Sequence, residues 1–151
     1  MSLRRNIGLA VAVTVIGIIA YLVGGLLYAW HHVPEAYAAW DTGSLLVAYM
    51  ESHDGRWPRG WDDLLSVLHG EGTRSIMMRG AEASDSEYPR RLREMVSIDW
   101  SFDPATSGPD ERPVVRPDNS RFPMVWEHAD PNEMVHRYIE GHLKASPKGA
   151  E

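Results

Sequence analysis

Residues 7–30 read IGLAVAVTVIGIIAYLVGGLLYAW, a run of 24 residues without one charged side chain. A bilayer core about 30 Å thick needs about 20 apolar residues at a helical rise of about 1.5 Å each. The run is therefore long enough to span a membrane with some tilt. Tyr28 and Trp30 end it, where amphipathic rings favour the headgroup layer. We predict a transmembrane helix over residues 7–30, with the lipid bilayer as its first partner.

The flanking charges set the predicted orientation. Arg4 and Arg5 precede the run, and no Lys or Arg follows it before Arg56. The positive-inside rule places residues 1–6 in the cytoplasm and residues from His31 onward outside the inner, or cytoplasmic, membrane. A cleaved signal peptide is the alternative, with cleavage after Ala38. We favour a permanent anchor, because the apolar run is much longer than the usual signal-peptide core of about 7–15 residues.

The remaining 121 residues suffice for one compact domain, which we assign to residues 31–145, followed by a polar tail over residues 146–151. The whole chain has a net charge of −6, and its first 30 residues hold two arginines and no acid, so the outer part carries −8. This acidity argues against a nucleic-acid partner. The chain has no cysteine, which excludes disulfides and thiolate sites.

Helical patterns dominate the first half of the outer part. Pro34 should end or kink the first helix, and a second helix should run from Glu35 or Asp41 to Ser52. The latter has one apolar face: Leu45, Leu46, Tyr49 and Met50. Asp54-Gly55 predicts a turn, and a short helix should follow it. The acids in its first turn are Asp62 and Asp63, and the leucines on its buried side are Leu64, Leu65 and Leu68.

The second half reads as loops and strands. Residues 70–90 have no clear period and are predicted to form a surface loop holding Ile76-Met77-Met78. From Val96 to Asp103 apolar and polar residues alternate strictly, which is typical of a half-buried strand. Residues 114–116 and 122–127 are further strand candidates, with a turn at residues 117–120. Residues 131–145 fit either a helix capped at Asp130-Pro131 or a hairpin turning at Glu140-Gly141.

One series of short motifs resembles type IV pilin-like and pseudopilin-like proteins: Tyr49, Asp54-Gly55, Trp57-Pro58 and Asp62-Asp63-Leu64. The resemblance implies an α+β fold in which the apolar helix continues into an amphipathic helix packed on a small antiparallel sheet of three to four strands. Residues 138–143, YIEGHL, are similar to the hairpin that ends many family members, and this favours the hairpin over the helix.

The N-terminus departs from the family pattern. Arg4-Arg5-Asn6-Ile7-Gly8 is similar to a prepilin leader, but Leu9 follows it and Val13 stands where the family has a glutamate. In the family that buried glutamate is thought to set the register between subunits. Its absence favours permanent anchoring over filament assembly.

Histidines and acids supply weak metal-site candidates. Glu127, His128, Asp130 and His136 lie close in sequence, and His128, Asp130 and His136 are the candidate ligands, since imidazole and carboxylate bind Zn²⁺. His31, His32 and Glu35 form a second such group. Asp99 and Asp103 share one face of the predicted strand and can be read as an acid–base pair. For all three groups we favour ordinary surface polarity, and we predict no catalytic residue and no cofactor.

Trp57 and Trp61 bracket Pro58, and this aromatic group is read in two ways. It can close the core from outside, or it can form an exposed recognition patch. Trp57, Pro58 and Trp61 are therefore the candidate interaction residues.

These features favour a non-enzymatic, single-pass, membrane-anchored structural or interaction protein with an extracytoplasmic domain. The resemblance suggests a pseudopilin-like component of envelope or secretion machinery, with other membrane or envelope proteins as partners. The alternative is a membrane-anchored metal-binding or hydrolytic domain that uses the His/Asp/Glu clusters.

Overall fold

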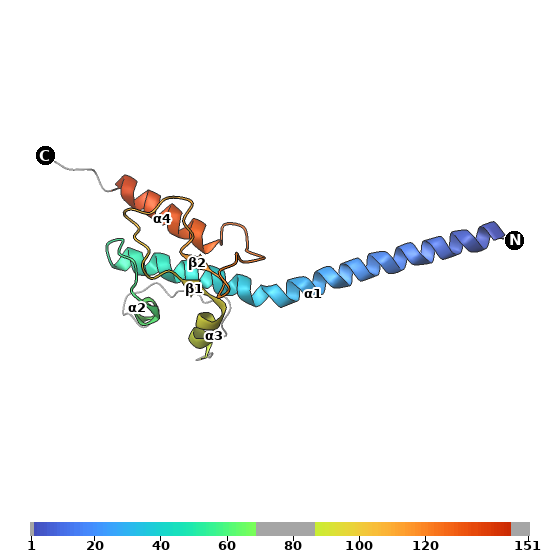
Figure 1. The fold of residues 1–151 in the computed structure, drawn as a ribbon, viewed down its shortest axis with the longest axis horizontal. Helices are drawn as coiled ribbons and strands as arrows, with labels where there is room; N and C mark the ends of the chain where they lie inside the picture. Colours follow the sequence, from blue (N-terminus) through green and yellow to red (C-terminus); the bar gives the residue numbers. More distant parts are fainter. Residues whose placement is uncertain (1, 69–86, 146–151) are drawn as a thin grey trace. The chain divides into compact units, whose positions relative to one another are not determined.

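The computed structural model describes residues 2–68 and 87–145 (Figure 1). In chain order its elements are α1 (Ser2–Ser52), α2 (Trp61–Ser66), α3 (Tyr88–Met95), β1 (Ser97–Ile98), β2 (Val114–Val115) and α4 (Pro131–Ala145). The chain divides into two compact units, one reaching Val33 and the other beginning at Pro34. The predicted patch Ile76-Met77-Met78 and the tail over residues 146–151 lie outside the described residues.

The first unit consists of the N-terminal part of α1. Its large apolar side chains from Val13 to Trp30 are exposed, and Trp30 is exposed over 80% of its surface. A helix that is apolar on all sides is stable only when it is covered by protein or by lipid. Among the described residues, α1 is the one helix long and apolar enough to cross a membrane. The first unit therefore supports membrane association.

The helix does not end at Pro34, which lies inside α1. A proline removes one intrahelical hydrogen bond, but the residues on either side keep theirs, so a helix can pass through it. In the second unit α1 becomes a core helix: Leu45, Leu46 and Met50 are fully buried and Tyr49 nearly so. This confirms the predicted apolar face.

Two short helices pack on this core. The first, α2, has Asp62 and Asp63 in its first turn and buries Leu64, as predicted, whereas Leu65 and Leu68 are half-buried and Leu68 lies beyond the end of the helix. The second, α3, was not predicted: residues 70–90 were expected to form a loop, and no element was assigned to residues 91–95. Its apolar anchors Tyr88 and Leu92 stand four residues apart among charged neighbours, and Val96 continues the spacing. A spacing of four is typical of a helix, but two such anchors in an eight-residue segment are too few to predict one from the sequence.

The sheet is smaller than predicted. Strands β1 and β2 are antiparallel, with Ser97 opposite Val115 and Ile98 opposite Val114. The predicted strand over residues 96–103 stops after Ile98, because the Asp99 carboxylate accepts hydrogen bonds from the Ser101 N–H at 2.9 Å and hydroxyl at 2.6 Å and closes a turn. Residues 122–127 form no strand. The described residues thus hold a two-stranded sheet with helices, which agrees with the α+β class alone.

The hairpin predicted over residues 131–145 is wrong, since this segment is α4. The Asp130 carboxylate caps the helix by accepting hydrogen bonds from the backbone N–H groups of Asn132 at 2.8 Å and Glu133 at 3.3 Å. Pro131 occupies the first helical position, where its missing N–H costs nothing. The capping signal thus outweighs the Glu140-Gly141 turn motif on which the hairpin depended.

Helices α4 and α1 cross closely at Gly43. A Cβ atom placed on Gly43 would lie 2.9 Å from both the Pro131 Cα and the Met134 Sδ. The missing side chain is therefore what lets the start of α4 lie against α1, with Val135 fully buried. The beginning of α4 is fixed in place, and α4 carries much of the site described next.

Candidate functional site

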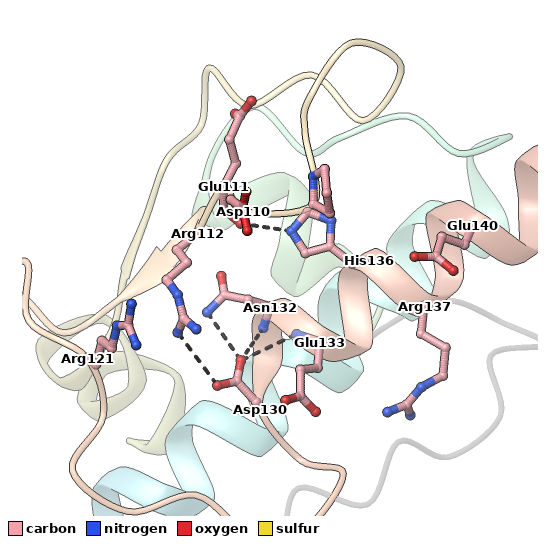
Figure 2. Close-up of a pocket in the computed structure, with 11 residues that line it drawn as sticks. Asp110, Glu111, Arg112, Arg121, Asp130, Asn132, Glu133, His136, Arg137 and Glu140 are labelled. Carbon is pink, nitrogen blue, oxygen red and sulfur yellow. Dashed lines mark hydrogen bonds and ion pairs between the residues drawn. The ribbon is translucent and has the colours of Figure 1, made fainter.

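A polar pocket of about 530 Å³ lies between the loop before β2 and the first turns of α4 (Figure 2). The loop contributes acidic and basic side chains to one wall, and α4 forms the opposite wall. The residues that line the pocket are Pro109, Asp110, Glu111, Arg112, Arg121, Asp130, Asn132, Glu133, His136, Arg137 and Glu140.

Asp130 ties the two walls together. One carboxylate oxygen caps α4, and the other lies 3.9 Å from the Arg112 Nη1 (Figure 2). The Asn132 amide nitrogen also donates to the Asp130 carboxylate, at 3.3 Å. The capping contacts therefore hold Asp130 at the floor of the pocket, and both of its carboxylate oxygens already have partners.

His136 closes the pocket on the other side. Its Nε2 lies 2.8 Å from the Glu111 carbonyl oxygen. A carbonyl only accepts, so Nε2 must carry the proton. The ring edge packs on Phe102, with 6.2 Å between the ring centroids. This contact fixes the ring and leaves Nδ1 as the nitrogen free to accept a bond when the imidazole is neutral.

The pocket carries charges of both signs. Five carboxylates and three guanidinium groups line it, which gives a local acidic excess. Within the described part of the chain, Arg121 and Arg137 make no ion pair, whereas Arg112 faces Asp130. Ligand pockets for small molecules are mainly apolar with few polar groups. A mixed-charge hollow of this kind instead suits charged side chains of a second protein.

The predicted metal ligands do not converge. His128 is exposed, has a positive φ of 62°, and lies 3.6 Å from the Glu127 carboxylate instead of lining the pocket. Asp130 and His136 line the pocket, but they are engaged as helix cap and as donor to Glu111. Across residues 2–68 and 87–145 no three His, Cys, Asp or Glu side chains are arranged to hold a metal ion.

Asp99 and Asp103 both close turns. Asp99 accepts two bonds from Ser101, and these bonds hold the pKa of its carboxyl below the usual value. Asp103 accepts from the Ala105 N–H and from the Thr106 hydroxyl, both at 3.0 Å. Local turn bonds therefore account for both carboxylates.

The aromatic group around Pro58 packs on its own domain. The Trp57 Nε1–H donates to the Asp99 carbonyl at 2.9 Å. The centroids of the Trp57 and Phe102 rings are 4.7 Å apart. Pro58 is fully buried. The Trp61 ring stands edge-on to Trp100 at 5.5 Å. Trp57 and Trp61 remain half-buried, so part of each ring still faces solvent.

The sequence reading missed a second aromatic group, in the loop before α4. Val125 and Trp126 are exposed over 36% and 37% of their surface, and among the side chains described at residues 34–68 and 87–142 no other large apolar one is so exposed. The Trp126 ring lies 5.7 Å from that of Tyr37. The available signal was the apolar run Met124-Val125-Trp126 directly before the polar pair Glu127-His128, in a segment that the sequence predicted to be a strand.

Comparisons with protein-family models, with curated proteins and with solved structures find no match to this chain.

Proposed function

We propose that the protein is a single-pass membrane protein whose extracytoplasmic domain serves as an interaction module for other membrane or envelope proteins. The observation that carries the proposal is the change of surroundings along α1. Its large apolar side chains are exposed through Trp30, and from Ala36 onward the helix is largely buried in the second unit. One helix thus supplies both the anchor and the central core element.

The polar pocket is the surface we assign to partner binding. Arg121 and Arg137 have no ion pair among the described residues, and exposed carboxylates such as Glu133 stand near them. Opposite charges on a partner would find complementary groups here, which favours specific association over tight burial. No lining residue needs to act as a catalyst in this role.

A pseudopilin-like role is a narrower form of the same proposal. The continuous α1 and the Asp54-Gly55 turn, with φ values of 53° and 77°, support it. Helix α4 in place of a terminal hairpin and Val13 in place of a glutamate favour an anchored accessory protein over a filament subunit.

Single-cysteine labelling tests the topology, because the chain has no native cysteine to remove. We expect Asn119→Cys, in an exposed turn, to react with a membrane-impermeant maleimide in intact cells. Ser2→Cys should react only after permeabilisation. The reverse pattern, or recovery of the protein in the soluble fraction, would contradict the proposal.

Site-specific photo-crosslinking tests the binding surface. A photoreactive residue at Arg137, in the pocket, should capture other membrane or envelope proteins in cells. The same residue at the exposed Arg59, outside the pocket, is the matched control. Equal capture at the two positions, or none at Arg137, would count against the pocket as the binding surface.

A further inference from the structure

We infer that the loop over residues 121–128, here named the aromatic loop, contacts the lipid headgroup layer of the bilayer that holds the protein's own anchor. The inference rests on the proposed anchoring and goes beyond it. It assigns the aromatic loop as a second membrane contact, separate from the transmembrane helix; Arg121, at the start of this loop, also lines the polar pocket.

Exposure singles out the aromatic loop. The other large apolar side chains described at residues 34–68 and 87–142 are more fully covered than Val125 and Trp126. A folded domain exposes such a side-chain pair to water at a cost of about 25 cal/mol for each Å² of apolar surface. Trp is also the residue type that favours the membrane interface, because its ring is apolar and its N–H is polar.

Contacts hold the aromatic loop at the beginning of the second unit. Trp126 packs on Tyr37, and the Arg116 Nη2 lies 3.1 Å from the Glu35 carboxylate just before the aromatic loop begins. Arg116 also bonds Asp118 and the Ser120 hydroxyl, which braces the turn leading into the aromatic loop. The aromatic loop is therefore fastened to residues that directly follow the anchor.

The covalent chain limits how far the aromatic loop can be from the bilayer. Tyr37 follows Trp30, the last residue of the predicted span, by seven positions. Seven residues reach at most about 25 Å even when fully extended, and less in any folded conformation. The headgroup layer itself adds about 5–8 Å beyond the hydrocarbon core. Tyr37, on which Trp126 packs, therefore lies at most about 20 Å beyond the headgroup layer.

The polar groups of the aromatic loop fit the same partner. Arg121 makes no ion pair within the described residues, so its guanidinium is free to bind a lipid phosphate. Glu127 and His128 are exposed beside Trp126 and can stay in water at the outer edge. An apolar pair with a neighbouring cation is the composition expected for interfacial binding to headgroups.

The test uses the full-length protein in liposomes of phosphatidylcholine and phosphatidylglycerol, at about one protein per vesicle. Val125→Cys carries an environment-sensitive NBD probe. Ala105→Cys is the matched control, since Ala105 is exposed near Gly55 and His142, beyond the other end of the core segment of α1. Quenching by lipids with a nitroxide near the headgroup reports contact with the interface.

We expect the probe at position 125 to emit at shorter wavelength and to be quenched at least twofold more than the probe at position 105. Adding Trp126→Ser should reduce that quenching. Equal quenching at both positions would overturn the inference. It would also be overturned if the probe at position 125 were protected from aqueous iodide but not quenched by the lipids, because protein would then cover it. If the chain fails to float with the liposomes at all, the anchoring proposal itself fails, a result distinct from both.

Discussion

The Asn132 side chain pairs with the backbone of Val114 as a neighbouring strand would. Its Oδ1 accepts a hydrogen bond from the Val114 N–H and its Nδ2 donates to the Val114 carbonyl, both at 2.9 Å. Val114 lies opposite Ile98 on its other side, so β2 is covered along both edges although the sheet has only two strands. Buried backbone groups need such partners, and one carboxamide from α4 supplies two of them.

Replacing Asn132 with alanine should destabilise the domain strongly. Val114 is 1% exposed, so its N–H and carbonyl would both lose their partner away from water. Each buried unsatisfied group costs about 1–3 kcal/mol, and we expect a loss of about 2–5 kcal/mol in the free energy of unfolding. Urea denaturation of the full chain in detergent, followed by tryptophan fluorescence, measures it.

Glu133→Ala is the matched control for this substitution. Glu133 is the exposed neighbour of Asn132, and its backbone N–H keeps its bond to Asp130 after truncation. Its effect should stay within about 0.5 kcal/mol. If Asn132→Ala is as mild as Glu133→Ala, the carboxamide does not act as the partner of β2.

Two glycine-to-alanine substitutions should act in opposite directions. At Gly43 the new Cβ would meet the Pro131 backbone and Met134 at 2.9 Å, so α4 must shift, at a cost of about 1–3 kcal/mol. Gly141 lies inside α4 with open space around it, and alanine there should stabilise by up to about 1 kcal/mol. Thermal unfolding by circular dichroism compares the two variants with the parent. A Gly43→Ala variant as stable as the parent would show that α1 and α4 do not cross at Gly43 as described.

The sequence predicted those elements whose signals are local and redundant. The apolar length of residues 7–30, the face formed by Leu45 and Tyr49, and the acids that begin α2 each needed no knowledge of distant residues. The alternation from Val96 also placed Ile98 and Phe102 correctly in the core. What it did not show is that Asp99 would bond Ser101 and turn the chain between them.

The misses have different causes. The hairpin prediction followed the family resemblance at residues 138–143, whereas the local capping signal at Asp130-Pro131 favoured the helix that is observed, with Val135 buried. The polar pocket depends on Arg112 and Asp130, 18 residues apart, meeting at 3.9 Å. No spacing rule in a single sequence encodes such a meeting, because it follows from where α4 lies on α1.

Tyr88→Phe should destabilise the domain through Asp41. The Tyr88 hydroxyl donates to the Asp41 carboxylate at 2.6 Å, and Asp41 is fully buried in α1. Removing the hydroxyl leaves a buried acceptor short of one donor, at a cost of about 1–3 kcal/mol. Tyr138→Phe is the matched control, because the Tyr138 hydroxyl makes no hydrogen bond within the described residues. Urea denaturation should separate the two, and equal losses would refute the role of the Tyr88 bond.

The Asp99 carboxyl should titrate below its usual pKa, and Ser101 should be the reason. The Ser101 hydroxyl and backbone N–H both donate to the charged form, which lowers the pKa of Asp99 in the folded state. A lowered folded-state pKa contributes stability above the unfolded value of about 3.9, and that contribution is lost as pH falls through the folded-state pKa. The Asp99–Ser101 turn should therefore favour folding at neutral pH and weaken in acid.

Ser101→Ala tests that assignment, since it removes the 2.6 Å hydroxyl bond and keeps the 2.9 Å backbone bond. We expect the pKa of Asp99, followed by NMR of its carboxyl carbon, to rise toward the usual value without reaching it. The stability difference between the parent and the variant should be full above about pH 5 and should shrink in more acidic solution. Ser66→Ala is the control, because that hydroxyl donates to the Asp63 backbone carbonyl and touches no carboxylate. An unchanged Asp99 titration in Ser101→Ala would mean that the backbone N–H alone holds the pKa down, and the hydroxyl would then have no part in the acid response of this turn.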